Sequence, residues 1–338
     1  MDLIKKILIL VIVLLAIFII YNLLKSRQAI KKNYIKKQKE GFDASGVSIA
    51  SIPAKYRSLP IREFIVKSSY NSAINDKNLA TKEQIKKVLE RGCRLIDFEI
   101  YTRNNLEFVA YSEDPEYQSM DTENGGLSLA DAFNTLVGYA FTMPSPSPSD
   151  PLFLLLRIKN NSSESYSRIA TLIDYSFKNY RYKGKFNGET RLKDIMNKIV
   201  IVLDKTSSPN YKNFVKCTSN PCFELSDYIH IETGSVQFPK YTYGNLETLP
   251  QKPVMTNKQN GTDIQTFMMI TPAQIDKIKS PDPVDTLSKW YPQFLLYKFY
   301  DQTKELQEYE NIFNTNQSSF IPISAIITEE RRNNAAKY

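Results

Sequence analysis

The sequence predicts an α/β fold, a (β/α)8 barrel of the TIM type with an N-terminal transmembrane helix. Strand-like and helix-like segments alternate from Pro53 onward, and "LFLLLRIK" and "KIVIVLD" are nearly continuous apolar runs, as buried parallel strands are. A doubly wound sheet is the alternative. That fold usually has a glycine-rich phosphate loop, and this chain of 338 residues has eleven glycines and no GxGxxG motif.

The N-terminus predicts a membrane anchor. Ile7–Leu24 is eighteen residues without a charge, about the minimum for crossing a bilayer. A cleaved signal peptide is the alternative, but the apolar stretch is too long and no small-x-small cleavage site follows it. Residues 1–25 are therefore predicted to be a single-pass transmembrane anchor.

The segment that follows the anchor is basic. Seven basic residues and no acidic one lie in Lys25–Lys39, whereas only Lys5 and Lys6 precede the span. This asymmetry predicts that the barrel lies on the cytosolic side, or on the inner face of a virion membrane. We interpret residues 26–52 as a juxtamembrane stalk that contacts anionic lipid headgroups, and we expect no nucleic-acid partner.

Residues 53–330 are predicted to form the barrel. Its first half has strands at 63–70, 94–101 and 106–112, and helices at 81–92 and 128–141. Thr81 and Gln84 form a predicted capping box, and Gly92 ends the helix. The second half has strands at 152–159, 198–204, 228–234, 264–271, 294–301 and 320–326, and helices at 162–180, 271–279, 284–291 and 304–314. The Pro/Gly/Asn-rich stretch 235–262 is predicted to be loop.

Function in such a barrel lies at the carboxyl ends of the strands. The residues at these ends are polar and of mixed charge: Ser68–Asn71, Asp97, Glu99, Tyr111, Ser112, Arg157, Lys159, Asp204, Lys205, His230, Glu232 and Thr271. The three cysteines and the single histidine exclude a zinc site of the usual spacing. Cys217 and Cys222 are expected to be reduced thiols in cytosol, with a small local disulfide as the alternative.

The segments "FIVKSSYNSAIND", "LERGCRLIDFEIY" and "LFLLLRIKNN" resemble the X region of eukaryotic phosphoinositide-specific phospholipase C. "LKDIMNKIVIVLDK" resembles the end of that region, and "MMITPAQIDK" and "LSKWYP" resemble segments of the Y region. The resemblance implies a PLC-like barrel and a phosphoinositide ligand. No accessory lipid-binding domain is recognisable.

The resemblance also implies that the catalytic groups are lost. The two catalytic histidines of the family fall on Tyr70 and Ser112. A tyrosine has an ordinary pKa of about 10 and a serine hydroxyl does not titrate near neutrality, so neither replaces a histidine. His230 lies on a different predicted strand and cannot replace both.

The calcium site of the family is expected to be vestigial. Asn71 matches a ligand, Asp97 and Glu99 stay acidic with their order reversed, and the fourth ligand falls on Lys159. Shifting the alignment by two residues puts Arg157 there instead. Either cation would pair with the two acids, and a cation among the ligands argues against calcium. No cofactor is therefore expected.

The positions that bind inositol phosphates in the family are better kept. They fall on Lys205, Thr271, Lys289 and Tyr291, and the alternative is that these are ordinary surface residues. The sequence therefore predicts a membrane-anchored, non-hydrolytic phospholipase-C-like barrel that binds a phosphate headgroup or has a structural role. An active phosphoric diester hydrolase is one alternative. An architectural component of a membrane-bound assembly, such as a large-DNA-virus virion, is the other.

Overall fold

The computed structural model describes residues 47–112, 126–214, 223–251, 267–273 and 278–335. The predicted anchor and most of the predicted stalk lie outside these ranges. Within the described ranges, no helix is both long enough and apolar enough to cross a bilayer.

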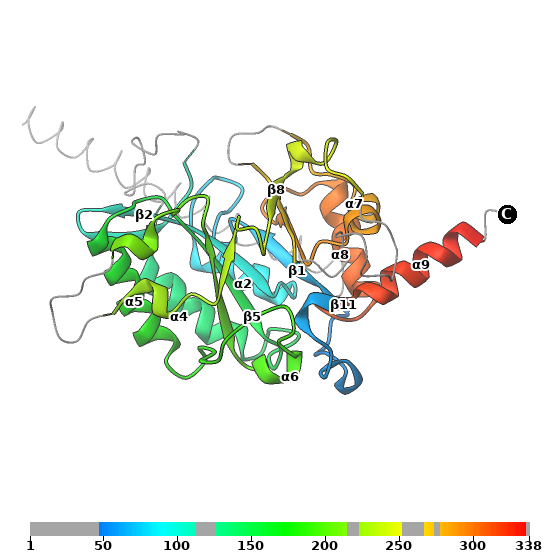
Figure 1. Ribbon diagram of the computed structural model, residues 1–338, viewed down its shortest axis with the longest axis horizontal. Coiled ribbons are helices and arrows are strands. Elements are labelled where there is room, and N and C mark those ends of the chain that lie inside the picture. The colour runs from blue at the N-terminus through cyan, green and yellow to red at the C-terminus, as the bar shows by residue number, and fades with distance from the viewer. Residues whose placement is uncertain (1–46, 113–125, 215–222, 252–266, 274–277, 336–338) are drawn as a thin grey trace, which may run out of the picture. The chain divides into compact units, whose positions relative to one another are not determined.

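Eight parallel strands form a nearly closed barrel, so the prediction of a TIM-type barrel is confirmed (Figure 1). Strand order follows the chain, and the last barrel strand pairs with the first. Among the described residues, no ladder joins β7 to β8, and we call this gap the seam. The strands are β1 (Phe64–Tyr70), β2 (Leu95–Arg103), β5 (Leu152–Ile158), β6 (Ile199–Asp204), β7 (Ile231–Thr233), β8 (Lys240–Thr242), β9 (Met269–Thr271) and β10 (Phe294–Lys298).

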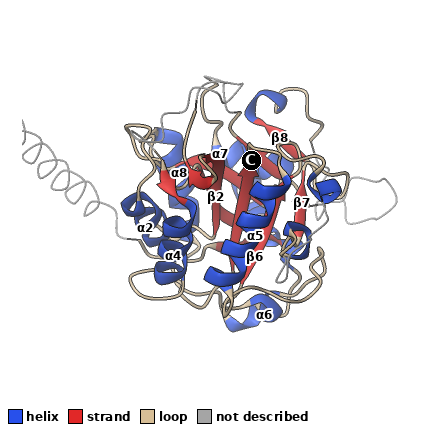
Figure 2. Cartoon of the chain, turned by 90° about the vertical axis from the view of Figure 1, so that its left-hand side faces the viewer, coloured by secondary structure: helices blue, strands red, loops and turns tan. Residues whose placement is uncertain are grey.

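Helices lie around the outside of the strands (Figure 2). A Ser, Thr or Asp side chain accepts the N–H of the residue three positions later at the start of α2, α4, α5, α7 and α8, which satisfies one free donor of each helix. Gly92 ends the region of α2 with φ +82°, a conformation that suits glycine. The α-helices are α2 (Lys82–Glu90), α4 (Leu129–Ala140), α5 (Ser163–Phe177), α6 (Leu192–Ile195), α7 (Pro283–Trp290), α8 (Lys304–Thr315) and α9 (Ile323–Ala335).

The predicted strand at 106–112 does not belong to the barrel. It forms β3 (Leu106–Val109), which pairs antiparallel with β2 and with β4 (Leu127–Ser128). Asn104 and Asn105 both have positive φ values, 51° and 59°, which allow a two-residue hairpin turn. This tight turn reverses the chain, whereas a barrel strand requires a crossover.

Two further differences concern short strands. The last predicted strand, 320–326, is β11 (Phe320–Pro322), which pairs antiparallel with β1, and the chain becomes helical at Ile323. The stretch 235–262, predicted as loop, contains β8. Its three residues, Lys-Tyr-Thr, are too few to show an alternating pattern. The predicted helix at 271–279 falls partly outside the described residues.

Alternation along the strands separates the barrel interior from the helix-facing side. The interior holds a buried apolar cluster that includes Phe64, Val66, Leu95, Phe153, Leu155, Val200, Val202, Met269, Phe294 and Leu296. Along each strand, the inward-facing positions are apolar inside the barrel and polar at the carboxyl end. On β2, for example, Leu95 is followed at alternate positions by Asp97 and Glu99. The mouth of the barrel is therefore lined by the residues that continue these inward-facing positions.

Candidate functional site

The end of β1 is bonded to β2 in a way that positions Asp97. Asn71 has φ 46°, a left-handed conformation that asparagine tolerates and that turns the chain sharply after the strand. Its backbone N–H donates to Asp97 Oδ2 at 2.8 Å. Ser72 closes the junction, because its N–H donates to the Asp97 carbonyl and its hydroxyl accepts the Asp97 N–H, both at 2.9 Å.

Arg157 of β5 lies between the two acids of β2. Its Nε donates to Asp97 Oδ1 at 2.8 Å, one Nη donates to Asp97 Oδ2 at 2.9 Å, and the other donates to Glu99 Oε2 at 3.1 Å. It also donates to Asn71 Oδ1. The strand register places Glu99 opposite Arg157, which brings these charges together. Both acids are fully buried and Arg157 is 4% exposed. The guanidinium therefore occupies the space among Asn71, Asp97 and Glu99.

The remaining contacts close this cluster. The Tyr70 ring lies 4.5 Å from the Arg157 guanidinium, a cation–π distance. Tyr101 donates its hydroxyl to Glu99 Oε1 at 2.5 Å, and Lys159 Nζ lies 3.6 Å from the same oxygen. Arg157 and Lys159, the two candidates for the fourth ligand position, thus both pair with Glu99. Arg157 also bonds to Asp97 and to Asn71.

The electrostatics of the cluster oppose proton transfer. Burial alone would lower the pKa of Arg157, but Asp97, Tyr70 and Glu99 outweigh it and hold the pKa well above its ordinary value. Burial raises the pKa of Tyr70 well above its ordinary value. Tyr70 therefore stays a neutral phenol at neutral pH and cannot serve as a general base.

The cluster does not fit a calcium ion. Both oxygens of Asp97, both of Glu99 and the side-chain oxygen of Asn71 lie within hydrogen-bond or ion-pair distance of N–H or O–H donors. Calcium requires several such oxygens for itself. In the described part of the chain, no group of three or more His, Cys, Asp or Glu side chains could hold a metal ion.

A pocket of about 360 Å³ lies at the mouth, lined by Tyr70 of β1, Arg157 of β5 and residues in or just after β5, β6, β8 and β9. Lys159 and Lys240 supply its other cations, and Thr206, Thr242 and Thr271 supply hydroxyl-bearing side chains. We call it the mouth pocket. Its guanidinium and ammonium groups are of the kind that recognises phosphate groups, whereas the protons of the three threonine hydroxyls are donated to Asp204, Asn245 and Pro272.

Asp204 holds Lys240 in this pocket. Lys240 Nζ lies 2.6 Å from Asp204 Oδ2, and the Thr206 hydroxyl donates to Asp204 Oδ1 at 2.7 Å. Burial alone would raise the pKa of Asp204, but Lys240 outweighs it and the pKa is lowered. Lys240 was missed by the sequence analysis because it lies in the stretch 235–262, where no strand pattern placed it.

The structure separates the four predicted headgroup-binding residues. Thr271 lines the mouth pocket, although its hydroxyl donates to the Pro272 carbonyl at 2.6 Å. Lys205 lines a different pocket. Lys289 pairs with Asp285 along α7 at 2.8 Å, and Tyr291 is fully buried at the end of that helix. Neither lines the mouth pocket, and a ligand-binding role for them stays a prediction.

Two further predicted positions are Ser112 and His230. Ser112 is 7% exposed and follows the hairpin strand β3. His230 bonds to two backbone groups, because its Nδ1 accepts the Ile201 N–H at 3.0 Å and its Nε2 lies 2.8 Å from the Tyr182 carbonyl. Burial lowers the pKa of His230. We interpret it as a neutral histidine. It lies just before β7 and bonds this end of the strand to β6 and to the segment between α5 and α6.

Comparisons with known proteins agree with this fold. The family model of the phosphatidylinositol-specific phospholipase C X domain matches residues 57–205. No curated protein sequence matches the chain. Among solved structures, L. pealei PLC21 matches with a TM-score of 0.57 and 13% identity over 79% of this chain, and the chain spans 37% of that protein.

A second solved structure is similar over its full length. The calcium-dependent phosphoinositol-specific phospholipase C from a Pseudomonas sp. matches with a TM-score of 0.51 and 10% identity over 82% of this chain and 100% of that one. At these identities the matches to solved structures show the fold alone. The resemblance to the X region is confirmed by the family model, whereas the resemblance to the Y region stays a prediction.

Proposed function

Because the chain is a member of the PI-PLC-like superfamily, we propose that it is a non-hydrolytic phospholipase-C-like barrel that binds a phosphate-bearing headgroup at the mouth pocket. The position of Arg157 is the observation that carries this proposal. A buried guanidinium bonded to Asn71, Asp97 and Glu99 supplies the positive charge at the position that the resemblance assigns to calcium.

The residues at the former histidine positions support the absence of hydrolysis. Attack on a phosphodiester requires a group that removes a proton near neutral pH. Tyr70 is a buried phenol with a raised pKa, and Ser112 has no titration in that range. The resemblance offers no other pair of acid and base groups at this position.

The mouth pocket supports headgroup binding. Lys159, which follows β5, and Lys240 of β8 line it and supply its ammonium groups. Its volume of about 360 Å³ is at the small end of ligand pockets, which suits a headgroup rather than a whole lipid. A Pseudomonas sp. enzyme of similar fold has been solved as a myoinositol complex.

A hydrolysis assay tests the first half of the proposal. The purified full-length chain is incubated with phosphatidylinositol and phosphatidylinositol 4,5-bisphosphate, with calcium or with a chelator, beside an active phospholipase C. We expect no release of inositol phosphate above the protein-free blank. Calcium-dependent release would refute the proposal and favour the alternative of an active phosphodiesterase.

A binding assay tests the second half. Inositol 1,4,5-trisphosphate is titrated into the full-length chain by calorimetry, with myo-inositol as the uncharged comparison. We expect the trisphosphate alone to bind, and Lys159→Gln to weaken it by about tenfold, because a charged hydrogen bond to phosphate is lost. Lys193→Gln, at an exposed position of α6, is the matched control. Equal affinity of the Lys159→Gln and control variants would exclude the mouth pocket as the site.

A further inference from the structure

A second and larger pocket lies beside the seam of the barrel. It has a volume of about 790 Å³ and shares no lining residue with the mouth pocket. Its wall is formed by β7 and by the connection 234–239 that leads to β8. We call it the seam pocket. Its volume lies within the range of pockets that bury a whole small ligand.

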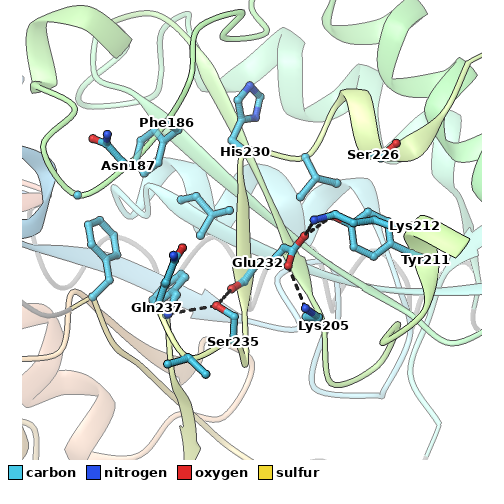
Figure 3. Close-up of a pocket in the computed structure, with 16 residues that line it drawn as sticks. Phe186, Asn187, Lys205, Tyr211, Lys212, Ser226, His230, Glu232, Ser235 and Gln237 are labelled. Carbon is cyan, nitrogen blue, oxygen red and sulfur yellow. Dashed lines mark hydrogen bonds and ion pairs between the residues drawn. The ribbon is translucent and has the colours of Figure 1, made fainter.

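One side of the seam pocket carries a surplus of positive charge. Glu232 of β7 accepts from Lys212, lies 3.3 Å from Lys205 Nζ, and accepts the Tyr211 hydroxyl at 2.7 Å (Figure 3). Burial alone would raise the pKa of Glu232, but these donors lower it to about 2. One carboxylate is thus shared by two ammonium groups. The lysine side chains are 40% and 59% exposed, so both remain open to a further anion.

The other side of the seam pocket carries three phenylalanine rings, together with the polar side chains of Asn187 and Gln237. Phe238 and Phe267 belong to the barrel core, and Phe186 packs against that core. Their rings are arranged edge to face, with centroids 6.3 Å apart for Phe186 and Phe267 and 5.2 Å apart for Phe238 and Phe267. Val236 lies on the connection and is 99% exposed. Because β7 and β8 are not joined, the edge of the core lines this pocket.

We propose that the seam pocket binds an amphipathic anion, a single alkyl chain that carries a phosphate or carboxylate. The anion would contact Lys205 and Lys212. Their two positive charges exceed the single negative charge of Glu232. The chain would cover Val236 and the phenylalanine edges, and so remove apolar surface from water. The proposal is independent of headgroup binding at the mouth pocket, because the two pockets have no residue in common.

An extended peptide that adds to the open edge of β7 is the competing occupant. The strand has only three residues, and the connection turns back at once, with the Gly234 N–H donating to the Phe238 carbonyl at 2.8 Å. Such a short edge offers few backbone bonds to a peptide. The paired lysines and the apolar wall therefore favour the amphipathic anion.

Photolabelling of the full-length chain in a zwitterionic detergent tests the proposal. The probe is hexadecyl phosphate with a diazirine in its alkyl chain, and the comparison probe is the corresponding uncharged alcohol. We expect the phosphate probe to label peptides from 229–238 and 186–188, at least threefold more strongly than the alcohol does. An excess of hexadecanoate should compete, whereas inorganic phosphate should not.

Three variants separate the two sides of the pocket. Lys212→Ala should reduce labelling by the phosphate probe about threefold and leave labelling by the alcohol unchanged. Val236→Asp, at a position that is 99% exposed and so does not disturb folding, should reduce labelling by both probes. Lys193→Ala is the control.

The opposite results would overturn the proposal. They are equal labelling by both probes, labelling that Lys212→Ala does not change, or competition by inorganic phosphate alone. None of these outcomes depends on whether inositol trisphosphate binds at the mouth, so the two proposals fail separately.

Discussion

At the scale of single residues, Arg157 joins Asn71, which follows β1, to the two acids of β2 at the mouth of the barrel. Its guanidinium is planar and offers five donors, which lets it bond to Asp97, Glu99 and Asn71 together. A lysine has one ammonium group and could not reach all three in this arrangement. Removing Arg157 would leave two buried carboxylates whose main cation is lost, which is expected to be strongly destabilising.

Replacing Arg157 by an oxygen donor should make the chain sensitive to calcium. In Arg157→Glu, and in the milder Arg157→Gln, the oxygens of Asn71, Asp97 and Glu99 lose their main donor and become available to a hard cation. We expect thermal unfolding of both variants to shift upward in calcium compared with chelator. Calcium at a hundred times its Kd adds about 2.7 kcal/mol to the free energy of unfolding.

The matched controls for the calcium effect are the wild-type chain and Lys159→Gln, which should show no shift. Magnesium requires a smaller and more regular ligand shell, so it should raise the unfolding temperature of the Arg157 variants less than calcium does. If neither Arg157 variant responds to calcium, these three residues are not a vestigial metal site, and that part of the resemblance is wrong.

Asp150 should give the chain a distinct pH dependence. Its carboxylate is fully buried and accepts the Ile52 N–H at 3.0 Å, and burial raises its pKa to about 6. A carboxyl whose pKa is higher in the folded than in the unfolded chain stabilises the fold below about pH 4, and this contribution is lost as the pH rises to about 6. The free energy of unfolding is expected to fall by about 2–3 kcal/mol over this pH range.

The measurement for Asp150 is urea unfolding between pH 4 and 7, compared between the wild-type chain and Asp150→Asn. The wild-type chain should lose stability relative to the variant between about pH 4 and pH 6, and the difference should be constant above that. A constant difference across the whole range would show that Asp150 does not titrate in this window.

At the scale of secondary-structure elements, one carboxylate fastens α8 to the barrel. Glu310 of α8 accepts the Arg91 Nε–H at 2.8 Å and lies 3.4 Å from Lys67 Nζ. Lys67 on β1 is fully buried, and its ammonium also donates to the Arg91 carbonyl at 2.6 Å. Burial alone would raise the pKa of Glu310, but Arg91 and Lys67 outweigh it and lower the pKa.

Glu310→Gln should therefore destabilise the chain strongly. Two cations that are largely buried lose their counter-charge, for which a loss of about 3–5 kcal/mol is expected. Glu308→Gln on the same helix removes an exposed pair with Lys304 and should change stability by less than about 0.5 kcal/mol. Equilibrium unfolding of the two variants checks this, and similar values for both would show that the Glu310 network contributes little.

Local patterns predicted most of the elements because their causes are local. The helices α2, α4, α5, α7 and α8 begin close to their predicted starts, and the predicted capping residue Thr81 caps α2. The hairpin strand β3, the three-residue strand β8 and the antiparallel strand β11 were the failures. Nothing in "LEFVAYS" tells an antiparallel hairpin strand from a barrel strand, because both have the same apolar pattern, and partner choice is a long-range property.

At the scale of the whole molecule, the attachment to a membrane stays a prediction of the sequence. Ile12→Arg combined with Leu15→Arg would place two charges in the middle of Ile7–Leu24, at a cost of about 5–7 kcal/mol for insertion. We expect the wild-type chain to remain in the membrane fraction after alkaline carbonate extraction and the double variant to be released. Gln28→Arg, outside the span, is the control. Retention of the double variant would refute the anchor.

The sequence by itself determined the alternation of strands and helices and the approximate starts of the helices, because periodicity and capping act over a few residues. By resemblance it also placed Tyr70 and Ser112 at the two histidine positions of the phospholipase C family, and this assignment stays a prediction. Only the tertiary structure decided that Arg157, rather than Lys159, lies among Asn71, Asp97 and Glu99. It also decided that Lys240 reaches the mouth and that the seam opens a second pocket. These depend on distances between strands far apart in sequence, and such distances are set by sheet register and barrel closure rather than by local pattern.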